Sequence, residues 1–560
     1  MSGPVKVDVL VVGSGAAGLS AAVTAAMHGA SVMVAEKASV LGGTSAWSGG
    51  WLWIPRNPLA RAEGIDEAAD APLTYLQHEM GGEAADIRLQ TFLRYGPEMV
   101  EFFHQRTAVQ FLSGSAMPDF HPSPGAANGG RSVTAQPYDG RLLGDWLHRL
   151  RPPLETISLG GMGIAAAARI WRIFSMPPAR RAPRCMLPAA CCATAGSGYA
   201  PDGGSIWSMA MRWSPVCCDP PSTAGVRFQL NAPVVRLLQG PPGVSGAVLR
   251  SDGGEIHVEA GAVVLACGGF PHDRQRLAQV VPHAAEGYGH FSAAPPDNQG
   301  EGIRLGESVG GQFDTSLRHP LAWAPVSRVT LASGQQLMFP HLVERAKPGV
   351  IAVLPNGKRF VNEADSYHDF IAALLAATPA GDTPQAWLLA DRRALRRYGL
   401  GHARPFPFTP TAWLRTGYLQ RGNTLAELAK QCAIDANALA ETVERFNHFA
   451  STGEDVDFHR GASAYNRAQG DHQVTLGPLR EGPFYAVRIL PGSLGTFSGL
   501  QTDEHARVLD EQQQPIPGLY AIGNDMSSVM RGYYPSGGIT LGPAMTFGYL
   551  VGKNLAKKQI

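Results

Sequence analysis

Charged residues are scarce and nearly balanced in this chain. They make up 17% of its 560 residues, and the formal net charge is +1. The sequence therefore lacks the basic excess with which proteins hold nucleic acid, and it lacks the field of one sign that attracts a charged surface. We expect no nucleic-acid partner.

Long hydrophobic runs are absent as well. The sequence has no apolar stretch of about 18 residues or more that could span a bilayer. Its first residues, MSGPVKVDVL, pass directly into a predicted strand without the apolar region of a secretion signal. We therefore expect a soluble cytoplasmic protein. A peripheral membrane contact through an apolar surface stays open, and it would suit a lipid-like substrate.

Cysteine is infrequent, and its arrangement does not suit a metal ion. Five of the seven cysteines lie between Cys185 and Cys218, as two adjacent pairs and one single residue, without C-x-x-C spacing. Adjacent residues rarely aim two thiolates at one ion, so we expect no metal site. Residues 185–224 also lack a helical period. We interpret this segment as local disorder, or as a disturbed reading frame that ends before Gly225.

The chain does contain a dinucleotide-binding fingerprint near its start. The apolar residues 9–12 predict a strand, Gly13-x-Gly15-x-x-Gly18 follows, and a run of small residues predicts a helix. Gly13 permits the tight turn, Gly15 lets the backbone approach a pyrophosphate, and Gly18 lets the helix pack on the strand. Glu36 stands at the distance, about 20 residues, at which a carboxylate binds the ribose. This unit predicts a redox enzyme.

A second run of small residues and hydroxyls follows, from Gly42 to Gly50. An NAD dehydrogenase does not need such a run at this place, whereas a flavoprotein can use it to line the diphosphate and the flavin. The run resembles the GGxSxxSGG segment of the FAD-dependent fumarate reductase and 3-ketosteroid dehydrogenase group. Members that attach the flavin covalently have a histidine in this segment, and none stands between Leu41 and Trp53. The resemblance therefore implies non-covalent FAD.

The C-terminal region carries the most specific motif. Residues 518–525, GLYAIGND, predict a strand that ends at the cofactor, and residues 533–548, YYPSGGITLGPAMTFG, predict a glycine-rich turn into a helix. The free N–H groups of that helix N-terminus could stabilise negative charge on a reduced flavin. The stretch closely resembles the Y-x-x-x-G-x-TLGPAMTF sequence of the 3-ketosteroid Δ1-dehydrogenases. This resemblance covers nearly the whole chain, with residues 185–224 excepted.

The expected fold is α/β. A Rossmann-type discontinuous FAD-binding domain, residues 1–290 and 481–560, is interrupted at residues 291–480 by an α+β substrate (cap) domain. The residues expected to contact FAD lie in the fingerprint, in the second small-residue run, on later strands that return to the nucleotide domain, and in the C-terminal motif. They are Gly13, Ser14, Gly15, Ala16, Ala17, Gly18, Glu36, Lys37, Gly43, Thr44, Ser45, Gly49, Gly50, Val234, Ala266, Gly268, Asn524, Thr540 and Leu541.

Residues 356–367, NGKRFVNEADSY, carry a G-x-RF-x-NE-x-x-x-Y pattern that is similar to one in the 3-ketosteroid Δ1-dehydrogenases. The resemblance implies that Tyr367 abstracts a proton, that the Tyr534 hydroxyl and the Gly538 N–H hold the carbonyl oxygen, and that FAD accepts a hydride. It implies Δ1-dehydrogenation of a 3-ketosteroid or a related cyclic 3-ketone, with electrons passed to a quinone or an artificial dye. A neutral tyrosine has a pKa of about 10, so Tyr367 needs help as a base.

In the family a further tyrosine assists this base from a D-Y-Y-P-like segment. This chain instead has Pro118-Asp119-Phe120-His121-Pro122. Phe120 cannot relay a proton, whereas His121 can accept one near neutral pH. We hypothesise that His121 is the relay, with a packing or solvated role as the alternative. The departure leaves the ring system and the direction of the reaction open.

Two other functions stay open. One is a flavin-dependent reductase of an enone or of fumarate. Fumarate reductases need a histidine in an H-x-x-G-G-like segment, but residues 494–500, LGTFSGL, contain none and are closer to the steroid enzymes' G-T-x-G-G-L. The other is a FAD-binding protein without turnover, if the cysteine-rich segment damages the catalytic domain.

Overall fold

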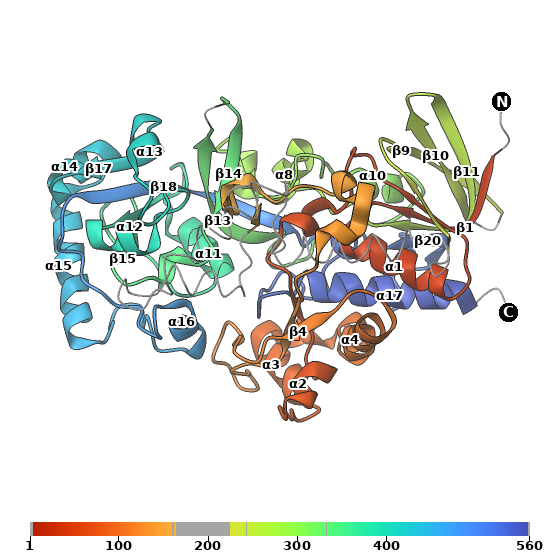
Figure 1. Ribbon diagram of the computed structural model, residues 1–560, viewed down its shortest axis with the longest axis horizontal. Coiled ribbons are helices and arrows are strands. Elements are labelled where there is room, and N and C mark those ends of the chain that lie inside the picture. The colour runs from red at the N-terminus through yellow and green to blue at the C-terminus, as the bar shows by residue number, and fades with distance from the viewer. Residues whose placement is uncertain (1–3, 160–161, 164–224, 242, 332, 558–560) are drawn as a thin grey trace.

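The computed structural model describes residues 4–159, 162–163, 225–241, 243–331 and 333–557. Two large sheets lie toward opposite ends of the molecule's long axis (Figure 1). Both chain termini lie on the side of the sheet that contains the N-terminal strand (Figure 1). Residues 185–224, for which we inferred local disorder or a disturbed reading frame, lie outside the described residues. The five cysteines of that segment lie outside them too.

Among the described residues, an eight-stranded sheet carries the N-terminal fingerprint. Its order is β19-β20-β11-β1-β2-β8, and β10 joins β11 to β9. The central strand β1 pairs in parallel with β2 and β11, and its valine-rich second half is buried because neighbouring layers cover the sheet. The strands are β1 (Val5–Val12), β2 (Val32–Ala35), β8 (Val226–Gln229), β9 (Val234–Gly240), β10 (Gly243–Ser251), β11 (Gly254–Leu265), β19 (Arg507–Leu509) and β20 (Pro515–Ala521).

Two helices from opposite ends of the chain, α1 (Ala16–Met27) and α17 (Leu541–Lys557), lie side by side against this sheet (Figure 1). Glycine makes the close approach feasible. A Cβ atom at Gly548 would lie 2.5 Å from the Ala17 carbonyl oxygen, and one at Gly552 would lie 2.7 Å from that of Ala21. The small residues of the two helices therefore bring the C-terminal motif next to the fingerprint.

A helical lobe lies beneath this sheet in Figure 1. It contains α2 (Pro58–Ala62), α3 (Ala71–Met80) and α4 (Ile87–Arg106). A small sheet, in the order β3-β5-β4, accompanies the helices. Its strands are β3 (Trp51–Trp53), β4 (Phe111–Ser113) and β5 (Ser132–Ala135).

The second large sheet, seven-stranded within the described ranges, is built around the long strand β18 (Phe484–Thr496). Its order is β14-β13-β18-β16-β15, with β12 and β17 also on β18. Strand β18 falls within residues 481–560, which the sequence analysis assigned to the second part of the FAD domain, yet all its partners belong to this second sheet. The other strands are β12 (Phe291–Ser292), β13 (Leu321–Thr330), β14 (Gln336–Pro340), β15 (Val350–Val353), β16 (Ala386–Ala390) and β17 (Leu419–Gly422).

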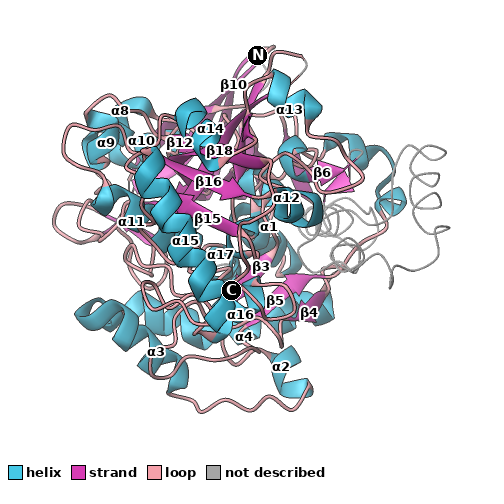
Figure 2. Cartoon of the chain, turned by 90° about the vertical axis from the view of Figure 1, so that its left-hand side faces the viewer, coloured by secondary structure: helices cyan, strands magenta, loops and turns pink. Residues whose placement is uncertain are grey.

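Helices cover the second sheet, as Figure 2 shows for α15 (Ala436–Thr452) in front of β15 and β16. Leu439 and Phe446 of α15 are fully buried in one apolar cluster with Ile351 and Leu389 of the sheet. The remaining elements are α8 (Arg274–Val280), α9 (Pro282–Ala285), α10 (Glu301–Glu307), α11 (Tyr367–Ala377), α12 (Arg392–Tyr398), α13 (Thr411–Arg415), α14 (Leu425–Cys432), α16 (Ala464–Gln469) and the hairpin β6 (Ser158–Leu159) and β7 (Met162–Gly163).

No helix in the described part of the chain is both long and apolar enough to cross a membrane. The same residues contain no group of three or more histidine, cysteine, aspartate or glutamate side chains placed to hold a metal ion.

Candidate active site

The fingerprint glycines stand where a side chain would collide with the fold. Gly13 has φ +107°, and a Cβ atom there would lie 2.3 Å from the Ala266 carbonyl oxygen. A Cβ at Gly18 would lie 2.1 Å from the Gly13 oxygen. Gly15, the N-cap of α1, is more open, since the Ser45 Oγ at 3.5 Å is the nearest atom to its Cβ position. The helix N-terminus at Gly15 can therefore approach a phosphate group closely.

The second small-residue run lies directly against this helix N-terminus. A short 3₁₀ helix, η1 (Gly43–Trp47), places the Ser45 Oγ 3.0 Å from the Ala16 N–H, from which it accepts a hydrogen bond. The Ser14 Oγ accepts from the Gly42 N–H at 3.1 Å. The structure thus brings the two glycine-rich runs of the sequence together in one place.

Glu36 lies just after β2 and is 9% exposed. Its Oε2 accepts hydrogen bonds from the Ser14 N–H and hydroxyl, at 3.1 and 2.6 Å, and its Oε1 accepts one from the Ala38 N–H. The carboxylate is therefore fixed beside the fingerprint turn. Its neighbour Lys37 points elsewhere, because its Nζ forms an ion pair of 2.5 Å with Glu301 of α10.

A buried aspartate that the sequence analysis did not single out, Asp525, holds the turn at Gly268 and Gly269. Asp525 accepts hydrogen bonds from the N–H groups of Cys267, at 2.6 Å, and Gly269, at 3.0 Å. Burial raises the pKa of Asp525 to about 6, although these two donors oppose the rise. The turn that it holds contains Gly268 at φ +89° and Gly269 at φ +79°. Asn298, also missed, donates to the Gly268 oxygen at 3.1 Å.

The remaining residues expected to contact FAD come from several elements. Thr44 accepts a hydrogen bond from Asn298 at 2.8 Å, which ties the second run to the Gly268 turn. Asn524 lies in the 3₁₀ helix η7 (Gly523–Asp525). Val234 begins β9, two residues after Ala232, whose N–H donates to the Glu36 carbonyl oxygen at 3.0 Å. Gly49 and Gly50 precede β3, Ala266 follows β11, and Thr540 and Leu541 stand at the start of α17.

The two tyrosines expected to be catalytic meet, although they come from different parts of the fold. Tyr367 is the first residue of α11, whose N-cap Ser366 accepts a hydrogen bond from the Asp369 N–H. Tyr534 lies in the loop before α17. The Tyr367 hydroxyl donates to the Tyr534 hydroxyl at 2.7 Å, and the ring centroids are 5.1 Å apart.

Both phenols are neutral at physiological pH. Burial raises the pKa of Tyr534 to about 12. Burial, followed by the proximity of Tyr534, raises the pKa of Tyr367 well above its usual range. Tyr534 is therefore suited to donate a hydrogen bond. Tyr367 can act as a base only after it loses its own proton, as a phenolate that a neighbouring donor or positive charge stabilises.

Gly538, four residues after Tyr534 in the sequence, has φ +101° and is packed against β3. A Cβ atom there would lie 2.6 Å from both the Trp51 oxygen and the Trp53 nitrogen. Its own carbonyl oxygen accepts from the N–H groups of Trp53 and Gly542. No described residue accepts a hydrogen bond from the Gly538 N–H, which leaves that donor for a ligand oxygen.

Phe120 lies among three tyrosines. It is 2% exposed, stacks on Tyr534 with ring centroids 5.7 Å apart, and meets the Tyr367 ring edge-on at 5.7 Å. The third, Tyr465 of α16, is 4.4 Å from Phe120 between centroids. Tyr465 escaped the sequence analysis because no motif surrounds it.

His121 is held by two carboxylates. Its Nδ1 lies 2.5 Å from Glu79 Oε2, and its Nε2 lies 2.8 Å from Asp369 Oδ2. Burial alone would lower the pKa of His121, but the hydrogen bonds and charges of Asp369 and Glu79 raise it to about 10. The relay hypothesised for His121 needs an imidazole that exchanges its proton near neutral pH, and this environment disfavours such exchange.

Known proteins resemble the chain over almost its full length. A family model described as FAD binding domain matches residues 8–541. The chain is 36% identical to a 4-oxocyclohex-2-ene-1-carboxylate 5-dehydrogenase of Sinomonas cyclohexanicum, over 98% of this chain and 94% of that protein. It is 34% identical to a 3-oxosteroid 1-dehydrogenase of Mycolicibacterium smegmatis, over 98% and 97%.

A solved structure is similar in fold as well as in sequence. The crystal structure of a 3-ketosteroid Δ1-dehydrogenase from Sterolibacterium denitrificans, in complex with 1,4-androstadiene-3,17-dione, superposes with a TM-score of 0.89. The two chains are 34% identical, and the match covers 99% of this chain and all of the other.

Proposed function

This chain belongs to the FAD binding domain family, and from that membership we propose that it dehydrogenates a cyclic ketone between the α and β carbons. The predicted resemblance to 3-ketosteroid Δ1-dehydrogenases is confirmed, and so is FAD as the cofactor. The open helix N-terminus at Gly15 and the fixed carboxylate of Glu36 fit a dinucleotide.

The observation that carries the proposal is the 2.7 Å contact between the hydroxyl groups of Tyr367 and Tyr534. Dehydrogenation removes a proton from the α carbon and a hydride from the β carbon. The Tyr534 hydroxyl and the Gly538 N–H bind the carbonyl oxygen, which makes the α proton more acidic. Tyr367 takes that proton in its phenolate form, so its own hydroxyl proton must leave the site first. Bound FAD supplies the acceptor for the hydride.

The two pKa shifts favour the role proposed for Tyr534 and oppose the role proposed for Tyr367. The high pKa of Tyr534 keeps its proton available for the carbonyl oxygen as negative charge develops there. The high pKa of Tyr367 opposes its action as a base, so the developing phenolate needs stabilisation. Arg345, which is buried and lowers the pKa of Tyr367, is the cation that opposes this rise.

We assign FAD binding to the Rossmann-type part built on the eight-stranded sheet, and ketone binding to the cap built on the seven-stranded sheet. The expected division at residues 290 and 481 leaves β18 in the FAD-binding part, although its partner strands belong to the seven-stranded sheet. A quinone or artificial dye as electron acceptor, the peripheral membrane contact and the cytoplasmic location stay predictions.

The substrate is a cyclic ketone, either a 3-ketosteroid or a single ring. Relatives named as 3-oxosteroid 1-dehydrogenases are 34% identical to this chain. Two named as dehydrogenases of 4-oxocyclohexane and 4-oxocyclohexene carboxylates are 37% and 36% identical. Both groups support oxidation of a carbon–carbon bond beside a ring ketone.

Anaerobic stopped-flow spectroscopy of the FAD-loaded protein tests the proposal. The substrates are androst-4-ene-3,17-dione, cholest-4-en-3-one, cyclohexanone and 4-oxocyclohexanecarboxylate. Bleaching of the flavin by a ketone would establish the dehydrogenase and identify the ring system. If none bleaches it, reoxidation of the chemically reduced protein by an enone or fumarate would indicate a reductase, and no reaction in either direction would indicate a FAD-binding protein without turnover.

A further inference from the structure

The segment Asp119–Ser123 contacts both tyrosines of the proposed site through the ring of Phe120. On one side, the Phe120 N–H donates to the Pro535 carbonyl oxygen at 3.0 Å. The Tyr75 hydroxyl of α3 donates to the same oxygen at 2.6 Å. Because Pro535 directly follows Tyr534, these bonds fix the segment to the loop that carries Tyr534.

On the other side, His121 connects the segment to the helix that carries Tyr367. Asp369, which binds His121 Nε2, is two residues after Tyr367 in the first turn of α11. Asp369 is itself held by the Ser366 hydroxyl at 2.6 Å. Glu79, which binds Nδ1 from the end of α3, accepts a further hydrogen bond from the Ser123 hydroxyl. Each ring nitrogen of His121 therefore bonds a carboxylate that has a second partner.

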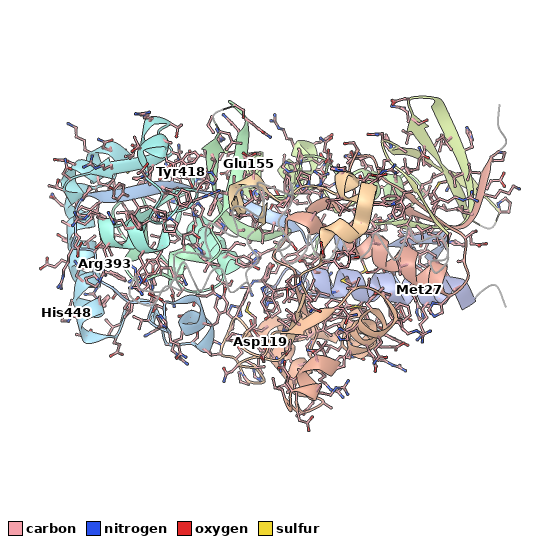
Figure 3. The ribbon with its side chains drawn as sticks, in the orientation of Figure 1. Met27, Asp119, Glu155, Arg393, Tyr418 and His448 are labelled. Atoms are coloured by element: carbon pink, nitrogen blue, oxygen red, sulfur yellow. The ribbon has the colours of Figure 1, made fainter. Side chains whose placement is uncertain are left out.

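The segment is also anchored at its start. Asp119 is 4% exposed and accepts hydrogen bonds from Trp53 Nε1 at 2.8 Å, the Ala127 N–H at 3.0 Å and Arg131 Nη1 at 2.6 Å. Figure 3 labels Asp119 in the helical lobe, next to the FAD-binding part. The anchor makes the segment a rigid support, so a bond from His121 to α11 restrains α11 rather than the segment.

We propose that His121 is a positioning residue that, by bridging Glu79 and Asp369, holds the first turn of α11 and so keeps the Tyr367 hydroxyl against Tyr534. The role rests on the proposed function, in which Tyr367 is the base. Tyr367 and Tyr534 belong to different parts of the fold, and their alignment depends on how firmly those parts are joined. A displacement of about 1 Å between reacting groups can cost about 100-fold in rate.

The ion pairs of His121 with Glu79 and Asp369 can hold the first turn of α11 because the three side chains are partly shielded from solvent. The side chain of His121 is 29% exposed, that of Glu79 is 11% and that of Asp369 is 36%. Partly buried pairs are screened by salt less than exposed pairs. Each ring nitrogen of the protonated His121 donates its own proton to one carboxylate, so the histidine serves as a fixed donor to both carboxylates, not as an exchanging relay.

Three variants of the full-length, FAD-loaded protein test the proposal: His121→Gln, Asp369→Asn and the double variant. We expect each single change to lower kcat about 10- to 100-fold, while KM for the ketone and the bound FAD stay within about threefold. The double variant should be no slower than the slower single variant, because both changes break the same connection. The matched control is His505→Gln, an exposed histidine beside Glu504, which should leave kcat unchanged.

Hydrogen–deuterium exchange of the same holoproteins gives a readout independent of turnover. We expect amides of the first turn of α11 to exchange about tenfold faster in His121→Gln, while those of α17 stay as in the wild type. If exchange in α11 does not change, or if kcat of His121→Gln stays within threefold of the wild type, the positioning role is wrong. Multiplicative losses in the double variant would also overturn it.

The two proposals fail in distinguishable ways. If the wild type oxidises no ketone but His121→Gln still loosens α11, the proposed function is wrong and the connection through His121 stands. If the wild type oxidises a ketone and His121→Gln changes neither kcat nor exchange, the function stands and the positioning role falls.

Discussion

The Tyr367 hydroxyl donates a hydrogen bond of 2.7 Å to the Tyr534 hydroxyl across a sequence separation of 167 residues. One ring begins a helix of the cap, and the other precedes the last helix of the FAD-binding part. Phe120 packs on both rings and excludes water from one side of the pair. In the proposed function, this contact joins the proton acceptor to the donor that binds the carbonyl oxygen.

Removing either hydroxyl should abolish most of the activity while preserving the fold. We expect Tyr534→Phe and Tyr367→Phe each to lower kcat/KM for the ketone by about 100-fold or more, because each removes a group that acts in the transition state. Stopped-flow flavin bleaching measures the effect. The control is Tyr549→Phe in the middle of α17, whose hydroxyl donates to Glu98 of α4 and whose loss should leave the rate unchanged. Near wild-type rates in both site variants would contradict the assigned roles.

Gly538→Ala should displace the N–H that binds the carbonyl oxygen. The new Cβ would lie 2.6 Å from the backbone of Trp51 and Trp53, so the turn must shift. We expect a loss of about 100-fold in kcat, the cost of losing one oxyanion donor. Gly287→Ala is the matched control, since Gly287 also has positive φ, +86°, but no atom within 4 Å. It should cost only backbone strain of about 1 kcal/mol in stability. Equal kcat in the two variants would contradict the role of Gly538.

Asp525→Asn should weaken FAD binding. The carboxylate accepts from two backbone N–H groups, whereas the Asn amide would turn an N–H₂ toward one of them. An unsatisfied buried donor costs about 1–3 kcal/mol, so we expect the Kd for FAD to rise roughly 10- to 100-fold. Fluorescence titration of the apoprotein with FAD measures the change. Asp510→Asn alters a carboxylate that accepts from two N–H groups of an exposed turn, and its Kd should match the wild type. An unchanged Kd in Asp525→Asn would contradict the prediction.

Glu363 should control part of the acid stability of the cap. Burial alone would raise the pKa of Glu363, but Arg359 and Arg460, at 2.7 and 3.0 Å, lower it to about 2. The folded pKa lies below the unfolded value of about 4.3, so the carboxylate stabilises the fold above that pH and stabilises it less as the pH falls toward 2.

The expected loss from this group between pH 4.5 and 2 is about 2 kcal/mol in the free energy of unfolding. In Glu363→Gln, stability should be lower at pH 7 and should fall less steeply over that range. Urea unfolding at a series of pH values measures both. Glu511→Gln, a change at an exposed glutamate, should follow the wild-type curve, and parallel curves for Glu363→Gln and the wild type would refute the prediction.

The sequence by itself determined the cofactor and the family. The demands that a dinucleotide makes on a backbone are local: a tight turn at Gly13, an open backbone at Gly15 and a close helix contact at Gly18. Each demand selects glycine at a fixed spacing, so the pattern could be recognised without a fold, and the structure places these residues where the pattern requires. The Tyr367 and C-terminal motifs were recognisable for the same reason, as short contiguous segments.

Tertiary structure alone decided how separate segments act on each other. The environment of His121 depends on Glu79, 42 residues away, and Asp369, 248 residues away, and these two carboxylates raise the pKa of a histidine that the sequence analysis expected to titrate near neutrality. Asp525 and Tyr465 escaped notice because their roles come from contacts with distant backbone and rings. Charge, burial and hydrogen bonding depend on which groups are close in space, and the spacing of residues along the sequence does not give those contacts.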